Sequence, residues 1–233
     1  MDALTRLGDG LFFVDGPVVR DMGVHFTTRM SVVQLSTGDV WVSSPVDVPF
    51  DVLSEIRRLG PVRYLVSATP RHFWRLYSWH TLFPDAELWS SPLTPITLKR
   101  GNLPLTGILD DQAALPWSPD LEHVVIRGSS WLKEVTFFHR PSRTLLMEDV
   151  IQIHEARPGH PVRNALIDLG GVAAPGGGVS RDIRLTFRHR DAARESVKRI
   201  LAWDFDTLVI AHGPLVTSAA RQTVENAFSW LTQ

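Results

Sequence analysis

Hydrophobic runs separated by turn signals predict strands at the start of the chain. The apolar run at 11–14 is ended by Gly16 and Pro17. The runs at 30–35 and 40–43 flank the turn-rich sequence "STGD", an arrangement that predicts a β-hairpin.

Helical spacing follows this hairpin. After Asp51, which we expect to cap a helix, apolar residues recur at intervals of three and four until Gly60 and Pro61 end the pattern. The first half then continues with a predicted strand at 62–66, a helix at 71–83 and a short strand at 86–89.

The second half repeats this plan after a loop-rich stretch at 101–120. We expect a strand at 123–126, a hairpin from 134–138 and 144–147, and then a glycine-rich loop, "GGVAAPGGGVS". Apolar residues at helical spacing predict a helix at 193–201, and the apolar run at 208–210 predicts a strand. We expect a last helix at 220–231, capped by Thr217 or Ser218.

The order of elements predicts an α/β (α+β) fold. Each half, about 1–100 and 121–233, runs hairpin, helix, strand and helix, although no sequence repeat is visible. Two mixed β-sheets packed together, with helices on both outer faces, satisfy this order within a single domain at 1–233.

Composition narrows the classes of function. Hydrophobic residues make up 44% and charged residues 21%, as in globular proteins, and the net charge of -1 gives no sign of a nucleic-acid binder. The absence of cysteine excludes disulfides, thiolate-bound zinc and thiol nucleophiles. The first ten residues do not resemble a signal peptide and no run is apolar enough to predict a membrane span, so we expect a cytoplasmic protein. We expect an unidentified small molecule as its partner, with no nucleic acid and no membrane; the oligomeric state stays open.

Three candidate metal ligands follow predicted strands. His72 follows the strand at 62–66, Asp149 the strand at 144–147, and His212 the strand at 208–210. Ligands gather beyond the carboxyl ends of strands in open α/β sheets. Imidazole and carboxylate groups suit zinc, iron or manganese, so one such ion is the expected cofactor if there is one.

This arrangement resembles the metallo-β-lactamase superfamily over nearly the whole chain. The strand followed by Thr-x-x-His, the hairpin ending in Asp and the strand ending in His-Gly carry the resemblance. The segments "RMSVVQLSTGDVWVSSPV" and "FFHRPSRTLLMEDV" are similar to a branch of bacterial and plant proteins that contains a domain of unknown function. The resemblance implies an αββα sandwich.

The resemblance also implies that the metal site is degenerate. In the superfamily motif Thr-His-x-His-x-Asp-His, Thr69 and His72 match, whereas Pro70, Trp74 and Arg75 replace ligands. Asp149 and His212 match the bridging aspartate and the last histidine, so three ligands of the usual seven remain. This argues against an ordinary dinuclear site. We expect Thr69, Trp74 and Arg75 to line the cleft.

Three interpretations stay open. In the first, the three matching residues hold one metal ion, with possible extra ligands at His25, His154 and Glu148, and the protein is a mononuclear metal-dependent hydrolase. In the second, the metal is lost, Arg75 pairs with Asp149 in its place, and the protein is a non-catalytic binding or scaffold protein. In the third, the three residues are structural. The catalytic residues and the substrate stay open.

Overall fold

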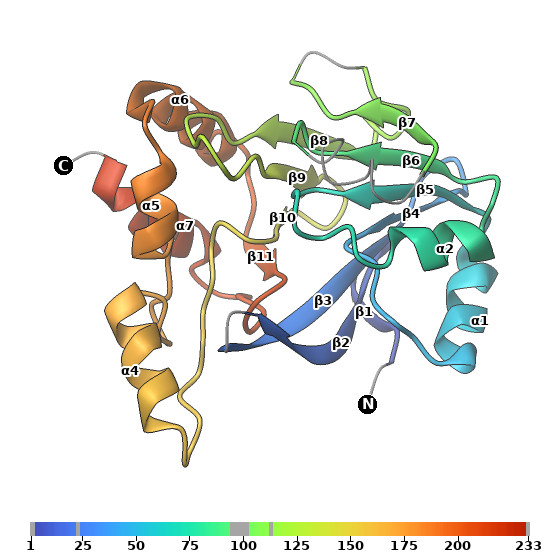
Figure 1. The fold of residues 1–233 in the computed structure, drawn as a ribbon. Helices are drawn as coiled ribbons and strands as arrows, with labels where there is room; N and C mark the ends of the chain where they lie inside the picture. The colour runs from blue at the N-terminus through green and yellow to red at the C-terminus, as the bar shows by residue number, and fades with distance from the viewer. Residues whose placement is uncertain (1–2, 22–23, 94–102, 112–113, 232–233) are drawn as a thin grey trace.

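The computed structural model describes residues 3–21, 24–93, 103–111 and 114–231. Within these residues two β-sheets pack face to face, with helices on both outer faces (Figure 1). This is the predicted αββα sandwich, and its two mixed sheets confirm the expected fold class. Residues 94–100 of the first predicted half, and 101–102 and 112–113 of the predicted loop, lie outside the described residues.

The first sheet has seven strands in sequence order. They are β1 (Thr5–Gly8), β2 (Leu11–Asp21), β3 (Val24–Gln34), β4 (Val40–Ser43), β5 (Val62–Ser67), β6 (Glu87–Ser90) and β7 (Leu105–Ile108). Strands β1 to β4 pair antiparallel and β4 to β7 pair parallel. The predicted hairpin around "STGD" is β3 and β4.

The second sheet has four strands in the order β11-β10-β9-β8. They are β8 (Leu121–Val125), β9 (Val135–His139), β10 (Thr144–Met147) and β11 (Thr207–Ile210). The predicted hairpin is β9 and β10, whereas β11 runs parallel to β10. This parallel pairing puts the carboxyl ends of β10 and β11 at the same edge.

The helices form the two outer layers (Figure 1). Helices α1 (Phe50–Leu59) and α2 (Leu76–Leu82) cover the first sheet. On the other side lie α4 (Pro161–Gly170), α5 (Arg181–Thr186), α6 (Arg190–Leu201), α7 (Ala220–Phe228) and the 3-10 helix η1 (Ser229–Leu231). No helix within the described part of the chain is both long and apolar enough to cross a membrane.

Three apolar clusters hold these layers together. The cluster between the sheets includes Trp41, Trp117 and Phe137, whose rings meet edge to face. The second cluster joins the first sheet to α1 and α2, and the third joins the second sheet to α6 and α7. Burial of apolar area on this scale is the main force that stabilises such a sandwich.

Several local predictions were wrong. Strands β2 and β3 are far longer than the predicted 11–14 and 30–35, because a register shift between Gly16 and Val19 lets the ladder continue past Pro17. Strand β7 lies inside the predicted loop, and α4 and α5 were not predicted. Asp51 lies in the first turn of α1, whose cap is Pro49, and Ala219 rather than Thr217 or Ser218 precedes α7.

Candidate metal centre

The three predicted ligands meet at the carboxyl ends of the strands. Met147 of β10 pairs with Ile210 of β11, and Asp149 and His212 each follow two residues later. His72 comes from the turn after β5. The predicted helix at 71–83 begins only at Leu76, because residues 70–75 form turns that carry His72 towards the second sheet.

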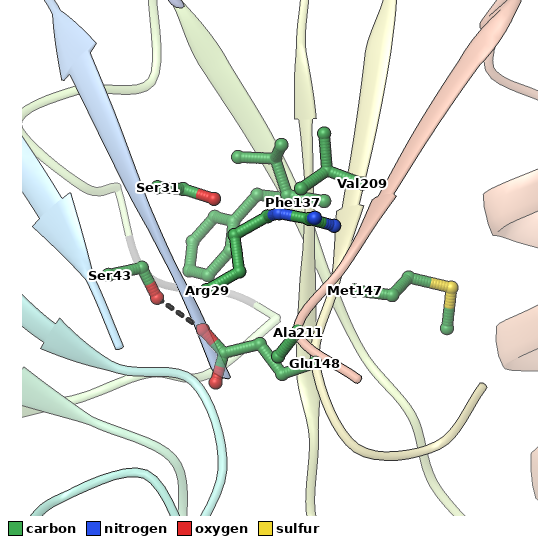
Figure 2. A pocket seen from close by; sticks show the side chains of 9 residues that line it. Arg29, Ser31, Ser43, Phe137, Met147, Glu148, Val209 and Ala211 are labelled. Carbon is green, nitrogen blue, oxygen red and sulfur yellow. Dashed lines mark hydrogen bonds between the residues drawn. The ribbon is translucent and has the colours of Figure 1, made fainter. Parts of the chain in front are cut away.

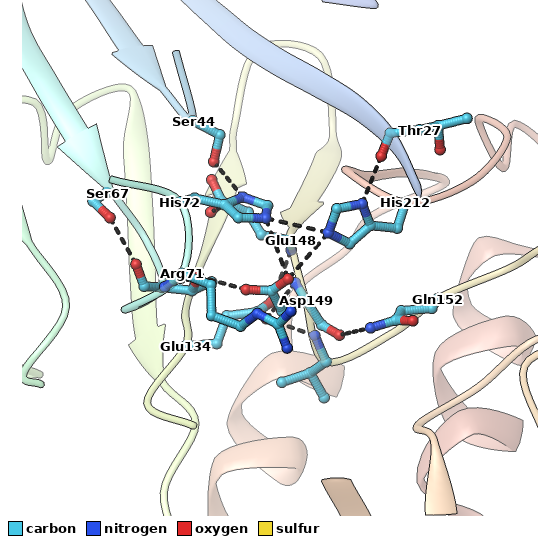
Figure 3. A network of polar contacts seen from close by, with 12 residues as sticks. Thr27, Ser44, Ser67, Arg71, His72, Glu134, Glu148, Asp149, Gln152 and His212 are labelled. Atoms are coloured by element: carbon cyan, nitrogen blue, oxygen red, sulfur yellow. Dashed lines mark hydrogen bonds and ion pairs between the residues drawn. The ribbon is translucent and has the colours of Figure 1, made fainter. Parts of the chain in front are cut away.

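The donor atoms of the three side chains form a nearly equilateral triangle (Figure 3). His72 Nε2 lies 3.2 Å from His212 Nε2 and 3.2 Å from Asp149 Oδ1, and His212 Nε2 lies 3.1 Å from Asp149 Oδ1. An ion about 2.0–2.2 Å from each donor fits a triangle with these edges. Among the described residues this is the one group of histidine and acidic side chains with such geometry.

The outer nitrogens of both imidazole rings face oxygen atoms. His212 Nδ1 lies 2.6 Å from the carbonyl oxygen of Thr27, which can only accept, so Nδ1 carries a proton. His72 Nδ1 hydrogen bonds to Ser44 Oγ at 2.8 Å and lies 3.0 Å from Glu148 Oε2. If His72 is neutral and also carries its proton on Nδ1, the Nε2 lone pairs of both rings point at each other and at Asp149, an arrangement that a bound cation or a second proton on His72 relieves.

The carboxylate of Asp149 is fixed from two sides. Thr69 Oγ1 donates to Oδ2, which leaves Oδ1 to face the two histidines. The backbone N–H groups of Glu148, Asp149 and Val150 donate at 2.7–2.9 Å to the carboxylate of Glu134, which is fully buried. Glu134 therefore shapes the turn that presents Asp149.

Electrostatics give these groups shifted pKa values. Burial alone would lower the pKa of His72, but the carboxylates of Asp149 and Glu148 outweigh it and raise this pKa well above its usual value. Burial would raise the pKa of Asp149, but His72 and His212 hold it well below its usual value. Burial and the charges of Asp149 and Glu148 raise the pKa of Glu134 to about 8.

Glu148 and His154, two of the three proposed extra ligands, make other contacts. Besides its contact with His72, Glu148 accepts a hydrogen bond from Ser43 and borders a cavity of about 10 Å³ between the sheets (Figure 2). His154 Nε2 faces Gln152 Oε1 at 3.0 Å, and burial lowers its pKa to about 4.

His25, the third proposed extra ligand, pairs with Arg20 in the β2–β3 ladder. None of these three residues belongs to the convergent group found in the described part of the chain.

The structure does not support the open interpretation in which Arg75 pairs with Asp149 in place of a metal. Arg75 is about half exposed and forms its ion pair with Asp47 rather than with Asp149. Trp74 is 75% exposed and stacks on Phe73, and therefore its ring does not fill a ligand position. Both residues line the rim of the cavity above the group, whereas Thr69 is buried behind Asp149.

Sequence reasoning missed the residues that hold the ligands. Glu134 stands in the apolar segment "WLKEVTFF", where a lone carboxylate is itself a signal of a buried polar role. Ser44 has a positive φ of 53°, and Arg29 hydrogen bonds to the carbonyls of Ile210 and Gly213 on either side of His212. No sequence pattern links these residues to the ligands.

Comparison with protein-family models shows which family the chain belongs to. The family model described as a domain of unknown function, DUF4336, matches residues 19–166, which is more than half of the chain. The chain belongs to the DUF4336 family. A search of curated proteins finds no match to it.

Solved structures give this DUF4336 protein the metallo-β-lactamase fold. The metallo-β-lactamase from Pontibacter korlensis matches with a TM-score of 0.65 over 100% of both chains at 11% identity. The enzyme from Hirschia baltica matches with a TM-score of 0.64 at 14% identity, over 99% of this chain and 97% of that one.

A flavodiiron protein has the same fold over part of its length. The protein from Giardia intestinalis matches with a TM-score of 0.67 at 16% identity, over 99% of this chain and 60% of that one. At such identities these similarities establish the fold alone.

Proposed function

We propose that this DUF4336 protein is a mononuclear metal-dependent hydrolase. The observation that carries the proposal is the triangle of His72 Nε2, His212 Nε2 and Asp149 Oδ1, with edges of 3.1–3.2 Å. Two histidines and one carboxylate are a recurrent ligand set for catalytic zinc and for non-haem iron, and manganese accepts the same donors. A bound ion of this kind polarises a carbonyl or phosphoryl oxygen and lets a water ionise near neutral pH.

The surrounding residues support this role by holding the ligands in place. Thr27 orients the ring of His212, while Ser44 and Glu148 orient the ring of His72. Such partners of the ligands fix the tautomer and strengthen metal binding. A cavity of about 740 Å³ opens over the group and leaves room for a substrate beside it.

Metal content tests the proposal directly. Tag-free protein purified without chelator should contain about one zinc, iron or manganese ion per chain, measured by elemental mass spectrometry. The double variant His72→Ala, His212→Ala should lose this ion, whereas His80→Ala, His189→Ala, which changes two histidines outside the group, should keep it. Circular dichroism checks that both variants fold.

The hydrolase part needs its own measurement. Protein loaded with each ion should cleave at least one of a panel of chromogenic esters, thioesters, amides and phosphodiesters, and Asp149→Asn should abolish the cleavage. A chain that binds its ion but cleaves none of these compounds would contradict the reaction and leave the metal site standing.

A specific observation favours a second candidate, a metal-free binding protein. The pKa of His72 is raised well above its usual value, so its imidazole ring can be protonated. The protonated ring lies between the carboxylates of Asp149 and Glu148 and can supply the positive charge that a metal ion would otherwise provide. Protein that stays metal-free after incubation with zinc, iron and manganese would favour this candidate over the hydrolase.

A further inference from the structure

The cavity above the metal group has two apolar walls. Its volume of about 740 Å³ lies within the usual range for small-molecule sites, roughly 300–1,000 Å³. His72, Asp149 and His212 contribute to its lining, so the proposed site opens directly into it. An acetyl-sized molecule would leave most of this space unfilled.

The first wall comes from β3, the helix α4 and the residues after it. Its apolar side chains include Phe26, Leu166, Ile167 and Val172. The ring centroid of Phe26 lies 5.4 Å from that of His212, so this wall begins in contact with a proposed ligand. Leu166 is 53% exposed at the outer end of the wall.

The second wall lies on the side of His72. Pro70, Phe73 and Trp74 surround this histidine in sequence and line the cavity together with Val46. Phe73 and Trp74 stack with ring centroids 5.0 Å apart. The cavity therefore has apolar side chains beside both His72 and His212, and those beside His72 include the exposed ring of Trp74.

Apolar side chains at the mouth of a cavity favour a ligand with an apolar part. Trp74, Leu166 and Val19 all line this cavity and are 75%, 53% and 42% exposed. Exposed apolar surface next to polar groups is typical of ligand-binding grooves. Because apolar side chains line the cavity both beside His212, at Phe26, and at its exposed mouth, at Leu166, the cavity fits an extended chain better than a compact polar molecule.

We infer that the cavity binds a carboxylic ester, or the carboxylate released from it, that carries an extended apolar chain. The chain lies along Phe26 and Leu166, and the oxygen-bearing group faces His72 and His212. The placement of this oxygen-bearing group rests on the proposed metal site, whose open side takes an oxygen donor.

The corresponding reaction balances with water alone. The oxygen of water bonds to the acyl carbon, and the acyl carbon–oxygen single bond breaks. One proton of the water leaves with the alcohol, and the other is released to the solvent when the acid ionises to the carboxylate. The carboxylate is then the product and does not turn over, which makes it a suitable probe of binding.

Isothermal titration calorimetry of the full chain with dodecanoate, below its micelle concentration, tests the inference. Dodecanoate should bind at least about tenfold more tightly than acetate, since each buried CH₂ contributes about 0.8 kcal/mol. Leu166→Glu should weaken dodecanoate binding about tenfold or more. Leu169→Glu, on the same helix and 63% exposed but outside the lining, should change it less than about twofold.

Two results would overturn the inference: dodecanoate binding no tighter than acetate, or an equal loss in both variants, which would indicate adsorption to the surface of α4. Metal content measured on the same samples separates this inference from the proposed function. Metal-loaded protein that does not prefer dodecanoate contradicts the ligand class alone. Suppose instead that the protein is metal-free but binds dodecanoate, and that Leu166→Glu weakens this binding while Leu169→Glu does not. This result would contradict the metal site and support binding of the apolar chain in the cavity.

Discussion

Glu148 Oε2 lies 3.0 Å from His72 Nδ1, on the side of the imidazole ring opposite the contact between Nε2 and Asp149. Glu148 is 7% exposed, and its other oxygen accepts a hydrogen bond from Ser43. A carboxylate behind a histidine ligand orients the ring and raises the basicity of the donor nitrogen. Glu148 thus acts on the proposed metal through His72.

Replacing this carboxylate should weaken metal binding without removing a ligand. Glu148→Gln keeps the size of the side chain but loses its charge, so we expect metal affinity to fall about 10–100-fold. Competition with a chromogenic chelator measures the change. Glu155→Gln, an exposed residue of the same segment, is the matched control and should keep wild-type affinity. Equal metal affinity in Glu148→Gln and wild type would show that Glu148 does not contribute to metal binding.

Arg29 fastens the loop of His212 to the first sheet. Its Nη1 donates to the carbonyl oxygens of Ile210 and Gly213, both at 2.9 Å, and Asp15 pairs with the same guanidinium. Arg29→Gln leaves these carbonyls without their charged donor, so the free energy of unfolding should fall by about 2–3 kcal/mol. Urea denaturation measures it.

The control for Arg29 is an exposed arginine with one ion pair. Arg6 pairs with Asp9, and the two side chains are 66% and 84% exposed. Arg6→Gln should therefore cost less than about 1 kcal/mol. If both variants lost the same small amount, the bonds from Arg29 to the loop would not contribute to stability.

Gly213 follows His212 directly, at a backbone φ of 152°. A Cβ atom there would lie 2.5 Å from the backbone carbonyl oxygen of Ile153, so the backbone would have to shift. Gly213→Ala should therefore cost more than about 1 kcal/mol of stability and lower metal affinity by displacing His212. Thermal unfolding and chelator competition measure the two effects.

Gly176→Ala is the matched control, because a Cβ at that position meets no atom within 4 Å. This variant should keep both the stability and the metal affinity of wild type. Normal metal binding by Gly213→Ala would show that the loop tolerates the displacement and that Gly213 serves stability alone.

The sequence predicted the strands of the sandwich and the identity of the three candidate ligands because both depend on patterns within short segments. Apolar runs and turn residues mark the strands, and His72, Asp149 and His212 each follow such a run. The parallel pairing of β10 and β11, which brings two of these side chains together, spans some sixty residues and has no local signal.

The partners of the ligands could not be predicted for the same reason. Glu134 acts on a turn fourteen residues away, and Arg29 on carbonyls 181 and 184 residues away. The interpretation of Arg75 failed because its place in a family motif said nothing about Asp47, its actual partner. Tertiary contacts of this kind depend on the assembled fold.

His139 gives a test of stability that is independent of the metal group. Burial lowers its pKa to about 4, against an opposing effect of Asp120, and its Nδ1 faces Ser142 Oγ at 2.7 Å. Since the unfolded chain binds the proton near pH 6.5 and the folded chain only near pH 4, stability falls as pH drops through this window. The largest effect of this one residue is about 3 kcal/mol, at about 1.4 kcal/mol per pKa unit.

Urea denaturation between pH 4 and 7 measures this dependence. His139→Gln removes the titrating group, so the variant should lose less stability than wild type as the pH falls, even if it is less stable at pH 7. His189→Gln, which changes an exposed histidine, should follow the wild-type dependence on pH. Parallel curves for wild type and His139→Gln would mean that other groups, and not the buried neutral imidazole, determine the acid sensitivity of the fold.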